Sequence, residues 1–174
     1  VLFRSVANDH LQGQANHDNA GDAFPRPTRS PAERTLAWFR EQGVRCRVIS
    51  GDNPVTVGAI ARRVKLTGDH EPVAMDAREL PEDVNELARV LENVDVLGRV
   101  LPDQKKAIVQ ALHTSDHVVA MTGDGVNDSL AIKEADLGIA MGNGEQCAKD
   151  AADWVADAVD TSGLAHAFER LGVV

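Results

Sequence analysis

The sequence is poor in cysteine, in basic charge and in long apolar runs. Its two cysteines, Cys46 and Cys147, lie far apart without the spacing of metal ligands, so we expect reduced packing residues and no disulfide. No apolar run approaches the roughly 18 residues that a membrane-spanning helix needs. The net charge of -9 argues against nucleic acid as a partner. With 174 residues, 43% of them hydrophobic, the composition fits one soluble α/β core.

The six histidines give no sign of a metal site either. Four of them are scattered, and His113 and His117 straddle Thr114-Ser-Asp116, a predicted turn. A pair of ligands at that spacing would need one continuous helical face. We therefore assign no histidine to chemistry.

The most informative stretch is Thr122-Gly-Asp-Gly-Val-Asn-Asp128, which follows an apolar run and precedes a predicted helix. Ligands of parallel α/β sheets collect at the carboxyl ends of strands, where Gly123 and Gly125 would let backbone amides approach a phosphate. Asp124 and Asp128 could hold a hard cation there. The same residue types are also common in turns, so this motif alone leaves a simple turn equally open.

A second predicted strand ends in Val48-Ile-Ser-Gly-Asp-Asn-Pro54. Asn53 suits the N-cap and the proline after it the first position of a helix, whose amino end would face the same site. Ser50 could hydrogen-bond a phosphate oxygen, with Gly51 and Asp52 beside it. In the alternative interpretation, Ser50 and Asp52 only cap the helix.

A third motif, Gly98-Arg-Val-Leu-Pro-Asp-Gln-Lys-Lys-Ala-Ile-Val109, predicts a helix that opens at Pro102 and Asp103. An ammonium group in its first turn would neutralise a bound phosphate and the carboxylates around it. We assign this role to Lys105. A lysine on a helix is more often a solvated surface charge, so the assignment depends on the motif and not on the residue alone.

These three strings, in this order and spacing, resemble the P-type cation-transporting ATPases, whose phosphorylation domain belongs to the haloacid dehalogenase superfamily. The likeness runs from Pro31 to about Gly142. It implies a three-layer, Rossmann-like α/β fold with a parallel sheet. It also implies Mg²⁺ as cofactor, ATP as the phosphoryl donor in the intact parent, and ATP-driven cation transport as the parent's activity.

The resemblance assigns a role to each polar residue of the three motifs. Asp124 would be a Mg²⁺ ligand, and Asn127 and Asp128 would support the metal and the phosphate. The phosphate would be bound by Lys105 and Ser50. Asp52 would lie beside the phosphorylated carboxylate.

The decisive departure from the family is the missing nucleophile. No D-K-T-G-T string and no D-x-D-x-T/V equivalent occurs, and Asp18 and Asp22 lie in polar surroundings. Without an aspartate at the end of a hydrophobic strand, no aspartyl-phosphate can form, so we expect the isolated chain to be inactive. We also expect the sheet to lack its central nucleophile strand and to be marginally stable. The nucleotide-binding, actuator and transmembrane domains would belong to the parent, which would hold this part at the cytoplasmic face of the membrane.

The two ends of the chain fit the family less well. Residues 1–30 are predicted to be a disordered or non-native arm, because Ala7 to Ser30 lacks apolar periodicity and the first five residues match a translated sequencing-adapter end. Residues 31–174 are predicted to form a partial haloacid dehalogenase-like domain. The last residues resemble instead the ends of soluble Cof-type phosphatases of the same superfamily. A soluble phosphatase and a non-catalytic remnant of the fold therefore stay open beside the pump.

Apolar patterning predicts alternating strands and helices. Strands are expected near Arg45–Ile49, Pro72–Met75, Val94–Gly98, His117–Met121, Leu137–Ala140 and Trp154–Ala156. Helices are expected near Ala32–Gln42, Val55–Val64, Pro81–Leu91, Asp103–His113, Asp128–Glu134, Gly144–Ala151 and Gly163–Leu171.

Overall fold

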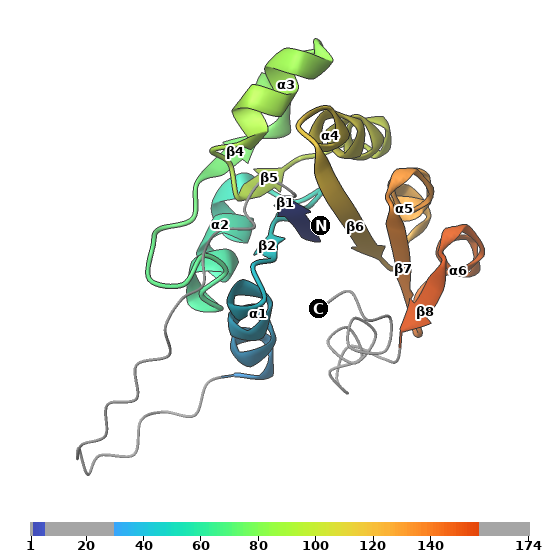
Figure 1. The fold of residues 1–174 in the computed structure, drawn as a ribbon, viewed down its shortest axis with the longest axis horizontal. Helices are drawn as coiled ribbons and strands as arrows, with labels where there is room; N and C mark the ends of the chain where they lie inside the picture. The colour runs from blue at the N-terminus through green and yellow to red at the C-terminus, as the bar shows by residue number, and fades with distance from the viewer. Residues whose placement is uncertain (1, 6–29, 157–174) are drawn as a thin grey trace.

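The computed structural model describes residues 2–5 and 30–156 (Figure 1). The predicted helix Gly163–Leu171 and the early aspartates Asp18 and Asp22 lie outside these ranges. In chain order the elements are β1 (Leu2–Ser5), α1 (Pro31–Glu41), β2 (Arg45–Cys46), β3 (Val48–Ile49), α2 (Pro54–Arg63), β4 (Ala74–Asp76), η1 (Ala77–Glu79), α3 (Val84–Leu91), β5 (Val96–Gly98), α4 (Pro102–Thr114), β6 (His117–Gly123), η2 (Val126–Asp128), α5 (Ser129–Glu134), β7 (Leu137–Met141), α6 (Gln146–Ala151) and β8 (Trp154–Ala156).

Local capping determines where several of these helices begin. The Asn53 side chain accepts a hydrogen bond from the Val55 amide at the start of α2, and a proline occupies the first turn, as predicted. Ser30 caps α1 in the same way, and Asp83 caps α3. The helices predicted within residues 30–156 are all present, and their ends lie within a few residues of the predicted ones.

The strands form two hydrogen-bonded sheets, ordered β2-β1-β6-β7-β8 and β3-β5-β4. Strands β3, β5 and β4 are parallel, and so are β6, β7 and β8. Because β1 is antiparallel to both β2 and β6, those two strands also point the same way. The motif-bearing strands therefore end at a common edge.

Strand β1 differs from the prediction. Residues 1–30 were predicted to be a disordered or non-native arm, whereas the structure places Leu2–Ser5 between β2 and β6. Strand pairing uses backbone groups, and an open edge of β6 can be satisfied by any extended segment. The segment contains no aspartate, so it supplies no nucleophile.

A single residue, Arg47, divides the predicted strand Arg45–Ile49 into β2 and β3. The chain passes here from one sheet to the other, because β2 pairs with β1 and β3 pairs with β5. The Arg47 guanidinium is buried and donates a hydrogen bond to the Leu91 carbonyl at the end of α3. Burial and the neighbouring Arg45 charge lower the pKa of Arg47 to about 9.

Helices cover both faces of the strands, as a three-layer fold requires. Figure 1 shows α4, α5 and α6 on one side of β6, β7 and β8, and α1 and α2 on the other. Neighbouring strand residues point to opposite faces. Val119 and Met121 pack with α3 to α6, whereas Ala120 and Ile139 pack with Phe39 of α1 and with α2. The predicted fold class is confirmed.

Within the described ranges, no helix combines the length and the apolar character that crossing a bilayer requires.

Replacing Gly138 with alanine tests the packing of β7 against α5. An added Cβ would lie 2.6 Å from the Ile132 carbonyl oxygen and 2.8 Å from Ile132 Cγ2. Overpacking of this kind lowers the free energy of unfolding by roughly 1–3 kcal/mol. Urea denaturation followed by circular dichroism measures the change. The control is Gly51→Ala, where nothing lies within 4 Å of the added carbon, and equal effects of the two substitutions would contradict the packing described here.

Candidate functional site

The Ser50 loop connects β3 to α2 and is held by β5 and the segment after it. The Ser50 amide donates to the Leu97 carbonyl at 2.9 Å, and its carbonyl accepts from the Val100 amide at 2.9 Å. Its hydroxyl accepts from the Asp52 amide at 3.1 Å. The loop is therefore fixed by its backbone, while Gly51 and the Asp52 side chain remain exposed.

Lys105 lies in the first turn of α4 and is buried, with 8% of its surface exposed. Its Nζ donates to Asp128 Oδ1 at 2.6 Å, and both side chains are largely excluded from solvent. The solvated-surface interpretation of Lys105 is thereby excluded. An ammonium group this buried needs its partner, because an unpaired charge would be costly.

The loop after β6 folds around the second oxygen of Asp128. Asp128 Oδ2 accepts from the amides of Asp124 at 3.3 Å and Gly125 at 3.2 Å. A Cβ on Gly123 would meet the Asp128 carboxylate at 2.5–2.7 Å, so only glycine allows this close approach. Asp128 thus binds three donors, two from the loop and one from Lys105.

Asp124 is positioned differently from Asp128. Its carbonyl accepts from the Glu145 amide at 2.7 Å, while its side chain is exposed. It lines a cavity of about 950 Å³ bounded by α1, α2 and the ends of β6 and β7. Asn127, on η2, is exposed as well. The loop therefore presents one carboxylate outward and turns the other inward.

The β5–α4 loop joins the two halves of the predicted site. Val100 in this loop contacts the Ser50 loop, and Lys105, in the turn of α4 that follows it, contacts the Asp128 loop. Among residues 30–156, no hydrogen bond connects the side chains of Ser50 or Asp52 directly to Lys105 or Asp124. The structure thus brings Lys105, Gly123, Asp124, Gly125 and Asp128 into one cluster, with the Ser50 loop attached to it through backbone contacts.

The donor set fits Mg²⁺ shared with a phosphate, not a closed structural metal site. Within the described ranges, no group of three or more His, Cys, Asp or Glu side chains is arranged to hold a metal ion. Protein-bound Mg²⁺ usually takes one or two carboxylates and completes its shell with water and phosphate oxygens. Asp124 offers such a carboxylate, whereas most of the capacity of Asp128 is used by its three donors.

One further carboxylate lies at this edge, and none of the three motifs contains it. Asp76 ends β4 and is paired in register with Gly98 of β5. Its Oδ2 accepts from Arg99 Nη1 at 2.6 Å and from Arg78 Nη2 at 2.7 Å. The hydrogen bonds from Arg78, followed by that from Arg99, hold the pKa of Asp76 well below its usual range. The sequence contained a signal for this residue, because Asp76 directly follows the apolar run Val73-Ala-Met75, and Asp124 likewise comes shortly after an apolar run.

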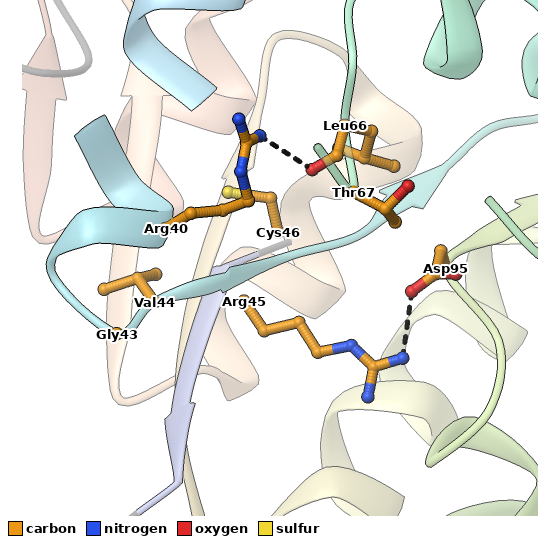
Figure 2. A pocket seen from close by; sticks show the side chains of 8 residues that line it. All are labelled: Arg40, Gly43, Val44, Arg45, Cys46, Leu66, Thr67 and Asp95. Carbon is orange, nitrogen blue, oxygen red and sulfur yellow. Dashed lines mark hydrogen bonds and ion pairs between the residues drawn. The ribbon is translucent and has the colours of Figure 1, made fainter. Parts of the chain in front are cut away.

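A second cavity, of about 310 Å³, is lined by none of the motif residues (Figure 2). The Arg40 guanidinium donates to the Leu66 carbonyl at 3.2 Å, and that of Arg45 donates to Asp95 Oδ1 at 2.9 Å. Cys46 in its wall is a buried free thiol, and burial raises its pKa to about 11. These contacts join α1 to the loop after α2, and β2 to the residue before β5, so we interpret the cavity as structural.

Comparison with known proteins identifies the family. The family model described as haloacid dehalogenase-like hydrolase matches residues 9–136. The chain belongs to this family.

The curated relatives are cation-transporting ATPases. The calcium-transporting ATPase CtpE of Mycobacterium tuberculosis is 50% identical over 153 residues, which cover 87% of this chain and 19% of the relative. The cation-transporting ATPase pma1 of Synechocystis is 40% identical over 129 residues, or 73% of this chain and 14% of the relative. The chain thus spans less than a fifth of the length of these relatives.

Solved structures agree with the fold. A zinc-transporting PIB-type ATPase in its E2.Pi state matches with a TM-score of 0.52 and 28% identity, over 72% of this chain and 16% of the other. The catalytic domain of the CPx-ATPase CopB-B matches with a TM-score of 0.56 over 83% of this chain and 44% of the other, and its 22% identity supports the fold alone.

Cysteine alkylation tests the burial of Cys46. At pH 8 a thiol with a pKa of about 11 is deprotonated in only about one molecule in 1,000, and the thiolate is the reactive form. We therefore expect iodoacetamide to modify the partly exposed Cys147 much faster than Cys46, as measured by mass spectrometry of tryptic peptides. In urea the two rates should converge. Equal rates in the folded chain would show that Cys46 is accessible.

Replacing Lys105 with methionine tests the buried ion pair. The substitution leaves the Asp128 carboxylate without its cation in a site largely closed to water, and we expect a loss of roughly 3 kcal/mol in the free energy of unfolding. The matched control is Lys106→Met. Lys106 is 43% exposed and lies 3.5 Å from Glu134, so its loss should cost less than about 1 kcal/mol. A similar cost for both variants in urea denaturation would contradict the assignment.

Proposed function

We propose that this chain is part of the ATP-dependent phosphorylation domain of a cation-translocating P-type ATPase. In the parent, ATP phosphorylates an aspartate that the present sequence does not contain, and hydrolysis of the aspartyl-phosphate drives ion movement. The nucleotide-binding, actuator and transmembrane domains belong to other parts of that protein. The parent holds this domain at the cytoplasmic face of the membrane.

The cluster around the Lys105–Asp128 ion pair is the observation that carries this proposal. Three ordered motifs meet at one edge of the strands, and the buried ion pair joins two of them. The curated relatives are transporters, which favours the pump over a soluble phosphatase of the Cof type.

Each residue of the site has a proposed task. Asp124 holds Mg²⁺, which shields the negative charge of the transferring phosphoryl group when it is bound. Lys105 supplies positive charge at the phosphate, and the Ser50 hydroxyl donates a hydrogen bond to it. Gly51, Gly123 and Gly125 allow close backbone approach. Asp52 lies beside the phosphorylated carboxylate, and Asn127 supports the metal and the phosphate. Asp128 supports the metal indirectly, because its hydrogen bonds fix the loop that carries Asp124.

Titration of the chain with Mg²⁺ in the presence of inorganic phosphate tests the metal assignment. Amide resonances of Gly123, Asp124 and Gly125 should shift with Mg²⁺, and Asp124→Asn should weaken the apparent affinity by at least about 10-fold. The control is Asp116→Asn at the other end of β6, where Asp116 has a φ of 57°, a conformation that asparagine tolerates. Unchanged Mg²⁺ affinity in Asp124→Asn would contradict the assignment.

Asp124→Asn also distinguishes a pump from a protein whose metal site has no part in phosphoryl transfer. In full-length protein that carries this sequence, Asp124→Asn should abolish Mg²⁺-dependent phosphoenzyme formed from radiolabelled ATP. The 174-residue chain alone should form none, because it lacks the nucleophile. Near-normal phosphoenzyme in the full-length variant would overturn the proposed function.

A further inference from the structure

The β5–α4 loop, which leads into the helical turn that carries Lys105, is attached to β4 by a salt bridge that no motif predicts. Asp76 Oδ2 accepts from Arg99 Nη1 at 2.6 Å, across 23 residues of sequence. The Asp76 carboxylate is only 10% exposed, whereas the Arg99 side chain is 40% exposed. An ion pair anchored on a largely covered carboxylate has less freedom to rearrange than one between two exposed side chains.

The Arg99 backbone adopts a conformation that side chains disfavour. Its φ is 55°, in the left-handed region that residues other than glycine, asparagine and aspartate rarely adopt. Its amide donates to the Asp52 carbonyl at 2.7 Å, so this conformation turns the loop toward the Ser50 loop. Such a conformation persists only when surrounding contacts hold it in place. The salt bridge to Asp76 is one such contact.

Gln104 provides a second attachment to the same neighbour. Its Nε2 donates to the Ala77 carbonyl at 2.9 Å, and its Oε1 accepts from the Leu101 amide at 3.0 Å. Asp76 and Ala77 are adjacent, so both attachments reach one point at the end of β4. The residue after Gln104 is Lys105, whose ammonium must reach Asp128 on the other side.

We propose that Asp76 is a positioning residue for Lys105, acting through Arg99. The carboxylate holds Arg99 in its left-handed conformation, and the fixed loop then directs Lys105 toward Asp128 and the phosphate. The importance of this position for phosphoryl transfer rests on the proposed function. The attachment itself is a property of this chain and can be tested separately.

The alternative is that Asp76 stabilises only the turn that it caps. The carboxylate also caps η1, accepting from the Arg78 amide at 3.0 Å, and forms a two-point contact with the Arg78 guanidinium. Arg78 is 70% exposed and only two residues away. A purely local role would make Arg78 the partner that matters, whereas a positioning role requires Arg99.

The test compares Asp76→Asn, Arg99→Gln and Arg78→Gln in the 174-residue chain. The first readout is the side-chain NMR signal of Lys105, with Lys106 as the internal reference. We expect Asp76→Asn and Arg99→Gln to move the Lys105 signal toward that of a solvated lysine, while Arg78→Gln leaves it in place. Asp76→Glu keeps the charge and should restore most of the wild-type signal. A residue that only stabilises the fold would not change Lys105 in folded molecules.

The second readout is the affinity for inorganic phosphate at saturating Mg²⁺. We expect it to weaken by roughly 10-fold in Asp76→Asn and Arg99→Gln. If Lys105 shifts while even the wild type binds no phosphate, the positioning role stands and the proposed function fails. If Lys105 is unchanged in both variants, or responds to Arg78→Gln instead of Arg99→Gln, the positioning role is wrong. Should Asp76→Asn fail to fold, the half-exposed Arg99→Gln variant decides between these outcomes.

Discussion

The ion pair between Lys105 and Asp128 is the contact on which the arrangement of the candidate site depends. It joins the first turn of α4 to the loop after β6, and it does so where water has little access. A buried pair of this kind is costly to desolvate and is retained only with good geometry and further hydrogen bonds. Asp128 meets that requirement by accepting two loop amides with its second oxygen. One carboxylate therefore determines both the position of the ammonium group and the course of the loop.

The direction of the strands explains why separate motifs meet at this ion pair. Strands β3, β5 and β4 run parallel, as do β6, β7 and β8, with helices returning the chain on both faces. Each polar motif follows a strand end, so all of them arrive at one edge. Strand β1 runs the opposite way and carries no motif, and it supplies backbone pairing between β2 and β6 without altering the edge.

Local signals predicted most of the described fold, and long-range contacts account for what was missed. Apolar runs located the strands after residue 44, and capping by Asn53 located the start of α2, because both depend on neighbouring residues. The pairing of β1 depends on the open edge of β6, which no local pattern of Leu2–Ser5 encodes. In the site, Lys105 and Asp128 were each predicted from their own motifs. The salt bridge that joins them, and the one that joins Asp76 to Arg99, each span 23 residues and follow no local pattern.

The two carboxylates of the loop after β6, Asp124 and Asp128, differ in burial and in their hydrogen-bond partners. Asp128 is buried and binds three donors, one of them a full positive charge, so a cation there would have to compete with Lys105. Asp124 is exposed, and among the described residues no side chain forms an ion pair with it. Under the proposed function, the outward carboxylate is therefore the Mg²⁺ ligand. A single carboxylate binds Mg²⁺ weakly until phosphate oxygens complete the shell. Under the proposed function, such a site would couple metal binding to the presence of the phosphoryl group.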